Sequence, residues 1–168
     1  MEITSTLTNT SGQEVHITYR NIESELDIVG KKVSAVHAFC FSKDQLVIVH
    51  DAAKRSWTPP GGSVEEGESV SDAIQREVRE ETNMKVVCQK VIGCQDITTL
   101  AGTTSQIRSA CIVEPYGDFI ADPDNDVTEI QLIDPKDYKK YFDWGAIGDR
   151  LMERALEAKA HLQAELDK

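Results

Sequence analysis

Three glutamates within five residues, Glu77, Glu80 and Glu81, are the side chains best suited to chemistry. In a helix, positions three and four residues apart share a face, so these carboxylates would fall within an arc of roughly 100°. The apolar residues of the segment lie on the adjoining arc, which predicts that the carboxylates stand beside the core, at the wall of a cleft. Like charges at this spacing repel, and a bound divalent cation removes the repulsion. Such oxygen ligands suit Mg²⁺ or Mn²⁺.

The residues before and after these glutamates predict a short helix behind a glycine-rich loop. Ser69 followed by Asp72 resembles a capping box, so the helix is expected at about residues 70–82. Asn83 suits the helix end, because asparagine tolerates the left-handed conformation that stops a helix. For the helix taken alone, a solvated surface helix with Glu–Arg pairs is the alternative.

The loop and the helix together follow one spaced pattern: Gly62, five residues, Glu68, seven residues, Arg76-Glu77-Val78, one residue, Glu80-Glu81, one residue, Asn83-Met84. This pattern resembles the signature box of the Nudix hydrolases (MutT-like). Asn83 stands where the family usually has glycine. The resemblance is direct over residues 57–84 and extends by layout over about 33–160. It implies an α/β fold, the α/β/α sandwich with a mixed β-sheet.

The resemblance also implies a metal site made of carboxylates and one backbone oxygen. Glu77 and Glu81 would be metal ligands, and Glu80 would share ligation or position water. The Gly62 carbonyl is a further expected ligand, because glycine lets the backbone approach closely. The implied cofactor is Mg²⁺, with Mn²⁺ as its substitute.

The reaction that the resemblance implies is hydrolysis of the diphosphate bond of a nucleoside diphosphate linked to another group. Arg76 would orient a neighbouring carboxylate, Glu68 above all, through a bidentate pair. The general base stays open between Glu81, Glu80 and Glu129, the last of which follows a later loop.

Substrate contacts are expected from Arg55, Phe39 and Trp57. For Trp57 a packing role and a base-stacking role both stay open. Further aromatic candidates for reading a base are Phe41, Tyr116, Phe119 and Trp144. By elimination, the small phosphorylated substrate is expected to be a nucleoside triphosphate. An ADP-ribose or nucleotide-sugar pyrophosphatase, and a non-catalytic nucleotide-binding module, are the alternatives.

Composition narrows the class of protein and its partners. The 168 residues, 40% hydrophobic and 28% charged, fit one globular domain spanning residues 1–168. The net charge of −11 argues against polymeric nucleic acid and against an anionic membrane surface. The sequence has neither an apolar run long enough to span a bilayer nor the basic and apolar start of a secretory signal, which predicts a cytoplasmic location. A homodimer is a common expectation for such a protein.

The rest of the chain predicts strands at 14–20, 33–41, 46–50, 85–98, 106–113 and 128–133. A short helix is expected from 134 to 141 and a long one from 144 to 166. Residues 1–12 are polar and are expected to be loosely held. The turn at 99–103 is a candidate to overhang the cleft. The acidic loop at 118–126 begins like a calcium loop, but Val127 replaces the required glycine, so an EF-hand is rejected.

Overall fold

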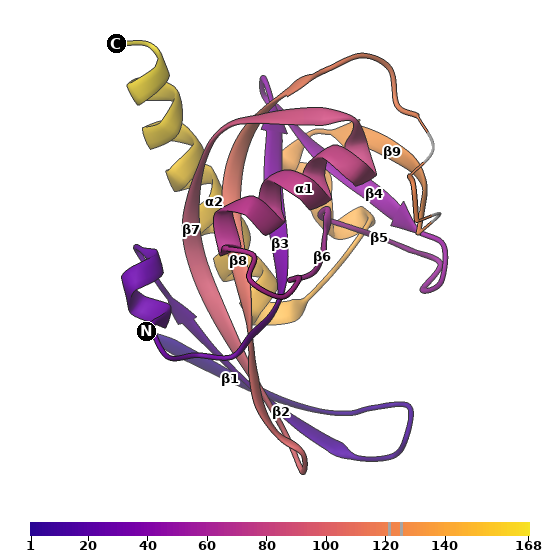
Figure 1. Ribbon diagram of the computed structural model, residues 1–168, viewed down its shortest axis with the longest axis vertical. Helices are drawn as coiled ribbons and strands as arrows, with labels where there is room; N and C mark the ends of the chain where they lie inside the picture. The colour runs from indigo at the N-terminus through magenta and orange to yellow at the C-terminus, as the bar shows by residue number, and fades with distance from the viewer. Residues whose placement is uncertain (121, 125) are drawn as a thin grey trace.

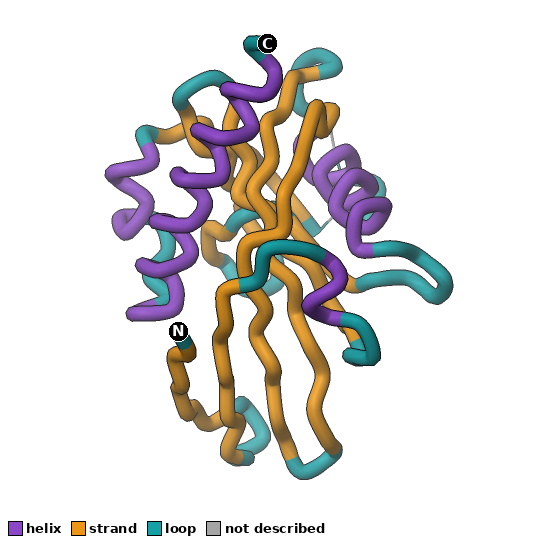
Figure 2. The backbone as a smooth tube through the Cα atoms, turned by 90° about the vertical axis from the view of Figure 1, so that its left-hand side faces the viewer, coloured by secondary structure: helices purple, strands orange, loops and turns teal. Residues whose placement is uncertain are grey.

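Strand β3 (Val33–Ser42) runs through the centre of the sheet, and its side chains contribute to the apolar cores on both faces. Because side chains alternate along a strand, Val36, Ala38 and Cys40 enter one core while Phe39 and Phe41 enter the other. Helix α1 (Val70–Thr82) covers the first face and α2 (Gly145–Leu166) covers the second (Figures 1 and 2). The strand is mainly apolar, interrupted by Ser34 and His37, as expected for a strand buried on both faces.

The computed structural model describes residues 1–120, 122–124 and 126–168. Within these residues the strands form one nine-stranded sheet. Its main order is β1 (Glu2–Thr8), β2 (Glu14–Asn21), β7 (Met84–Thr99), β8 (Gly102–Pro115), β3, β4 (Gln45–Asp51) and β5 (Ser56–Thr58). Strand β6 (Gly61–Ser63) pairs with β3, and β9 (Val127–Ile133) pairs with β4. Two short 3-10 helices, at Glu25–Ile28 and Pro135–Lys140, complete the described elements.

The pairing of β3 with β8 is parallel and the other pairings are antiparallel, so the sheet is mixed. The predicted α/β class with a mixed sheet between helices is confirmed. The opposite edge of β3 is shared, because β6 pairs with residues 35–37 and β4 pairs with residues 40–42. This division of one edge between two strands opens the sheet beside α1.

The ends of α1 lie where the sequence predicts them. The Ser69 hydroxyl accepts a hydrogen bond from the backbone N–H of Asp72 at 3.0 Å. Asn83 ends the helix with φ of 54°, the left-handed conformation. Its side-chain amide donates to the carbonyl of Asp118 at 2.9 Å and so ties the helix end to the acidic loop.

Two expectations about flexible segments were wrong. Residues 2–8, expected to be loosely held, form β1, which pairs with β2 from Glu2 opposite Arg20 to Thr8 opposite Glu14. Backbone pairing with β2 and the apolar contact of Ile3 hold this exposed edge strand in place. Neither interaction produces an alternating apolar pattern from which the sequence could predict a strand. The turn between β7 and β8 lies at the far end of their long hairpin in Figure 1, away from α1. No helix of the described residues is both long and apolar enough to cross a membrane.

Candidate active site

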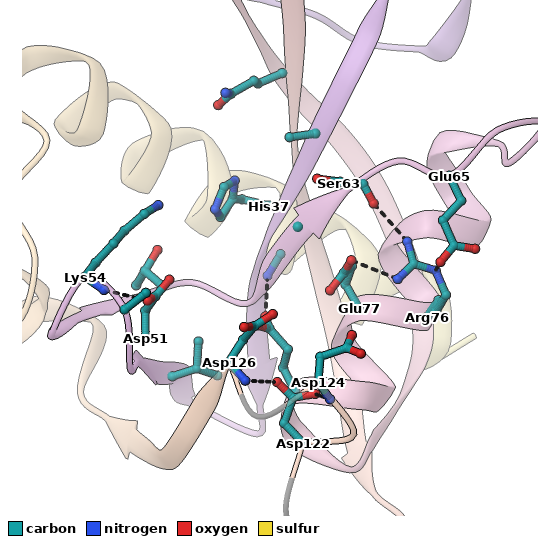
Figure 3. Close-up of a pocket in the computed structure, with 18 residues that line it drawn as sticks. His37, Asp51, Lys54, Ser63, Glu65, Arg76, Glu77, Asp122, Asp124 and Asp126 are labelled. Carbon is teal, nitrogen blue, oxygen red and sulfur yellow. Dashed lines mark hydrogen bonds and ion pairs between the residues drawn. The ribbon is translucent and has the colours of Figure 1, made fainter. Parts of the chain in front are cut away.

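A cavity of about 540 Å³ opens beside the carboxylate face of α1. Its wall includes β3, β4, the loop through Gly61 and Gly62, and the acidic loop before β9. Figure 3 shows acidic residues of α1 and of the acidic loop that line it: Glu77, Asp122, Asp124 and Asp126. Glu81 lines the same cavity, and so do Asp51 and Glu65. Segments far apart in the sequence thus bring seven carboxyl groups to one cavity.

Glu81 is a buried carboxylate of the cavity that the backbone holds in place. It is only 7% exposed, and its Oε1 accepts a hydrogen bond of 2.7 Å from the backbone N–H of Gly61. Burial raises the pKa of Glu81 to about 8, and the nearby charges of Glu77, Asp122 and Asp126 add to this effect. A buried carboxyl group surrounded by like charges is a frequent mark of a functional site.

Arg76 links the glycine-rich loop to the helix. Its Nε and Nη2 donate to the two oxygens of Glu68 at 2.8 and 2.9 Å, which is the expected bidentate pair. Nη1 donates to Glu77 at 2.8 Å and to Glu80 at 3.3 Å, and Nη2 also donates to the carbonyl of Ser63 at 2.9 Å. Burial raises the pKa of both Glu77 and Glu80, against the opposing charge of Arg76. One guanidinium therefore orients the outer carboxylates.

Gly62 lies directly against Glu77. A Cβ built on Gly62 would lie 2.5 Å from Oε1 of Glu77, closer than any side chain tolerates. A side chain at position 62 would therefore push the Glu77 carboxylate aside, and its absence lets the backbone of the loop lie next to that carboxylate.

The acidic loop is the part of the site that sequence reasoning missed. Asp122 is 3% exposed and accepts hydrogen bonds of 3.1 Å from the backbone N–H groups of Asp124, Asp126 and Val127. These bonds close the loop on itself, and the loop faces α1 across the cavity (Figure 3). The aspartates alternate in the sequence, but their spacing does not show that they lie near a helix about forty residues earlier.

The donors present fit a hard divalent cation. They are all oxygens, supplied by Glu77, Glu81 and the aspartates of the loop, and carboxylate oxygens are what Mg²⁺ and Mn²⁺ prefer. Across residues 1–120, 122–124 and 126–168, no three His, Cys, Asp or Glu side chains stand in a ready-made ligand geometry. The pairing of Glu77 with Arg76 accounts for part of this, because it draws that carboxylate toward the guanidinium.

Five of the expected site residues lie outside this cavity. Glu80 lines a different cavity beside α1. Phe39 is fully buried in the core under α2, next to Trp144, so a substrate contact by Phe39 was wrong. Arg55 is exposed in the turn before β5, at φ of 52°, while the adjacent Lys54 lines the cavity. The local turn, which the sequence did not reveal, decides which of the two cations faces inward.

Glu129 is exposed on β9, opposite His50, and lies outside the residues that line the cavity. Its neighbour Ile130 packs on the core under α1, so strand alternation directs Glu129 to the other face. Trp57 is half-buried and packs edge-on against His50 and Tyr141, with ring centroids 5.1 and 6.1 Å apart. It also lines a second cavity that adjoins the first.

Comparison with known proteins places this geometry in a family. A model of the NUDIX domain matches residues 31–155. The chain is 36% identical over 50 residues to the uncharacterized Nudix hydrolase YvcI of Bacillus subtilis, a match that covers 30% of this chain and 32% of that relative. The matched region therefore spans about a third of the relative.

Solved structures share the fold. The pyrophosphohydrolase BsRppH of Bacillus subtilis superposes with a TM-score of 0.65 at 15% identity, covering 92% of this chain and 97% of that one. A NUDIX hydrolase from Nitrosomonas europaea superposes with a TM-score of 0.59 at 18% identity, covering 77% and 91%.

Proposed function

Because this chain belongs to the Nudix family, we propose that it is a metal-dependent hydrolase of nucleoside triphosphates. The bond cleaved is a diphosphate bond of a nucleoside diphosphate linked to another group. One observation carries the proposal: Glu77 and Glu81 of α1 line one cavity with the Gly61-Gly62 loop and the aspartates of the acidic loop. The signature box from Gly62 to Met84, which departs from the family pattern at Asn83 and keeps its glutamates, supports it.

The residues that would hold Mg²⁺, or Mn²⁺ in its place, are Glu77, Glu80, Glu81 and the carbonyl of Gly62. A divalent cation bound there supplies the positive charge that neutralises phosphoryl oxygens and assists the attacking water. The acidic loop faces the same space, and its aspartates add negative charge that retains the cation. The charge of the bound cation would thereby offset, within the cavity, the repulsion between the acidic protein and a polyanionic substrate.

Arg76 acts through other residues, so we assign it a positioning role. Its contacts with Glu68, Glu77 and the Ser63 carbonyl hold the loop and the helix at a fixed distance. We assign deprotonation of the attacking water to Glu81, which the Gly61 N–H fixes at the wall of the cavity. Lys54 lines the opposite side and is placed to meet a phosphate group.

The test is release of phosphate or pyrophosphate from nucleoside triphosphates, ADP-ribose, nucleotide sugars and dinucleoside polyphosphates. Each substrate is assayed with Mg²⁺, with Mn²⁺ and with a chelator. We expect metal-dependent turnover of triphosphates that Glu81→Gln abolishes. Glu66→Gln, an exposed glutamate of the loop, is the matched control and should retain full activity.

Two results would contradict this proposal in different ways. Turnover confined to ADP-ribose or nucleotide sugars would keep the hydrolase and replace its substrate. Nucleotide binding without turnover by any member of the panel would instead identify a non-catalytic binding module.

A further inference from the structure

A second cavity, of about 480 Å³, adjoins the first on the face of the sheet that α2 covers. The two share wall residues, among them His37, Lys54 and Gln106. Helix α2 begins at Gly145, and the second cavity is lined by Trp144 and Ile147 at this start of the helix. Strands β1, β2, β7 and β8 form its floor. A cavity of this size accommodates a nucleoside.

Arg108, on the floor of this cavity, is a buried cation without an anionic partner. It is 5% exposed, and its Nη2 donates to Oε1 of Gln106 at 2.8 Å. Its Nε and Nη1 are buried and have no hydrogen-bond partner among the described residues. Burial lowers the pKa of Arg108 to about 10, since no carboxylate of the described chain pairs with it. The ring of Trp144, 5.7 Å from its guanidinium carbon, is a weak substitute.

Two further polar groups of the same wall lack partners. Oε1 of Gln95, a residue 8% exposed, and Nδ1 of His37 are both buried and unpaired in the described part of the chain. Gln95 stands opposite Gln106 across β7 and β8, and His37 stands opposite Arg108 across β3 and β8. The pairing of the strands therefore places the unpaired N–H donors of Arg108 and the unpaired acceptor of Gln95 on the neighbouring strands β8 and β7. Leaving such groups unpaired costs stability, which a ligand that pairs with them would restore.

The rest of the wall favours a flat ring over a phosphate group. Apolar and aromatic side chains make up much of it, including Trp57, Trp144, Ile17 and Ile97. Burial lowers the pKa of His37 well below its usual value, and the charges of Arg108 and Lys54 add to this, so His37 is neutral near pH 7. Apart from Lys54, which also lines the first cavity, the wall has one guanidinium beside neutral amides and a neutral imidazole, and this set suits a ring carbonyl rather than a dianion.

We propose that this cavity binds the base of the substrate and that Arg108 and Gln95 select a 6-oxopurine, that is guanine or hypoxanthine. The inference rests on the proposed function, because the phosphates are taken to occupy the first cavity. Arginine donates to the O6 and N7 acceptors of such a ring. The N1–H of the ring is the donor that Oε1 of Gln95 lacks. Adenine carries an amino group in place of O6, so donors would face the donors of Arg108.

The experiment compares kcat/KM for GTP, ITP and ATP in the wild type and in Arg108→Met. We expect the wild type to favour GTP and ITP over ATP by at least about tenfold. Arg108→Met should remove that preference by lowering the values for GTP and ITP, while the value for ATP stays within about twofold. Arg150→Met, which removes a partly buried arginine of α2 that pairs with Glu153, is the matched control and should keep the preference.

Folding of the variant is checked by thermal unfolding. Arg108→Met removes a buried charge that has no carboxylate partner, so its Tm should equal or exceed that of the wild type. A Tm well below the wild-type value would show that Arg108 supports the fold, and would count against a role in recognition. Equal kcat/KM for GTP and ATP in the wild type, or an unchanged ratio in Arg108→Met, would overturn the proposal.

Binding of guanosine and adenosine, which carry no phosphate, separates this inference from the proposed hydrolysis. Tighter binding of guanosine that Arg108→Met abolishes supports the base site even if no triphosphate is hydrolysed. Hydrolysis of triphosphates without any preference among bases leaves the proposed function standing and removes the base site.

Discussion

Arg76 makes contacts that only a guanidinium can make. It forms two bonds to Glu68 and one each to Glu77 and the Ser63 carbonyl at 2.8 to 2.9 Å. Lysine keeps the charge but lacks the planar fork that reaches several oxygens at once. At the scale of single residues, the site therefore depends on shape as much as on charge.

We predict that Arg76→Lys lowers kcat by about 10- to 100-fold with little change in KM, because misplaced carboxylates impair the reaction more than binding. Steady-state kinetics on the preferred triphosphate measures both parameters. Arg79→Lys, an exposed arginine of the same helix, is the control and should retain wild-type values. Wild-type kcat in Arg76→Lys would refute the positioning role.

We predict that Gly62→Ala reduces kcat/KM by about 100-fold. The new Cβ would lie 2.5 Å from Oε1 of Glu77 and would push that carboxylate out of its position. Gly117→Ala is the matched control, since the nearest atom to its Cβ would be 3.9 Å away. Activity assays and thermal unfolding of both variants test this. Full activity of Gly62→Ala would show that the loop moves freely and that the contact is unimportant.

At the scale of elements, Asn83 performs two tasks at the end of α1. Its left-handed backbone stops the helix, and its side chain holds the carbonyl of Asp118. Glycine, the usual residue of the family at this place, performs the first task alone. The departure from the family pattern thus connects α1 with the acidic loop that carries Asp122.

We predict that Asn83→Gly keeps the thermal stability but raises the Mg²⁺ concentration needed for half-maximal activity by about tenfold, because the loop loses its tether. Asn83→Ala loses the tether and the favourable left-handed backbone, so it should show the same metal dependence and a lower Tm. If both variants need the same Mg²⁺ concentration as the wild type, the tether of the acidic loop does not affect metal binding.

At the scale of the whole molecule, Asp96 joins parts of the sheet that lie far apart in sequence. Its carboxylate accepts from Lys31 at 2.8 Å, from Arg20 of β2 at 2.8 Å and from the hydroxyl of Ser105 of β8 at 2.6 Å. Burial would raise the pKa of Asp96, but these hydrogen bonds outweigh burial and hold it well below its usual range.

A depressed pKa in the folded state stabilises the protein above the pKa of the unfolded chain, about 3.9, and this stabilisation is lost as the pH falls toward the folded value. We predict that Asp96→Asn lowers the free energy of unfolding by about 1–3 kcal/mol at pH 7, with a smaller deficit below about pH 4. Denaturant unfolding of both proteins from pH 7 to pH 2 measures this. The control Asp44→Asn, at a fully exposed aspartate that pairs with Lys159, should match the wild type throughout. A deficit independent of pH would assign the effect to packing.

The sequence by itself determined α1 and the glycine-rich loop, because caps, helical periodicity and the signature box are local properties of neighbouring residues. It also determined the long strands and α2, whose apolar patterns are periodic. The cytoplasmic location and the homodimer stay predictions.

Tertiary structure decided the rest of the site. The register of the sheet places Gln95 and Arg108 in one cavity, and the tether at Asn83 links the acidic loop to the end of α1. Long-range packing also buries Phe39. Contacts between distant segments depend on how the strands pair and on which face each side chain takes, and a one-residue shift in pairing reverses that face. Spacing along the chain carries no record of these choices.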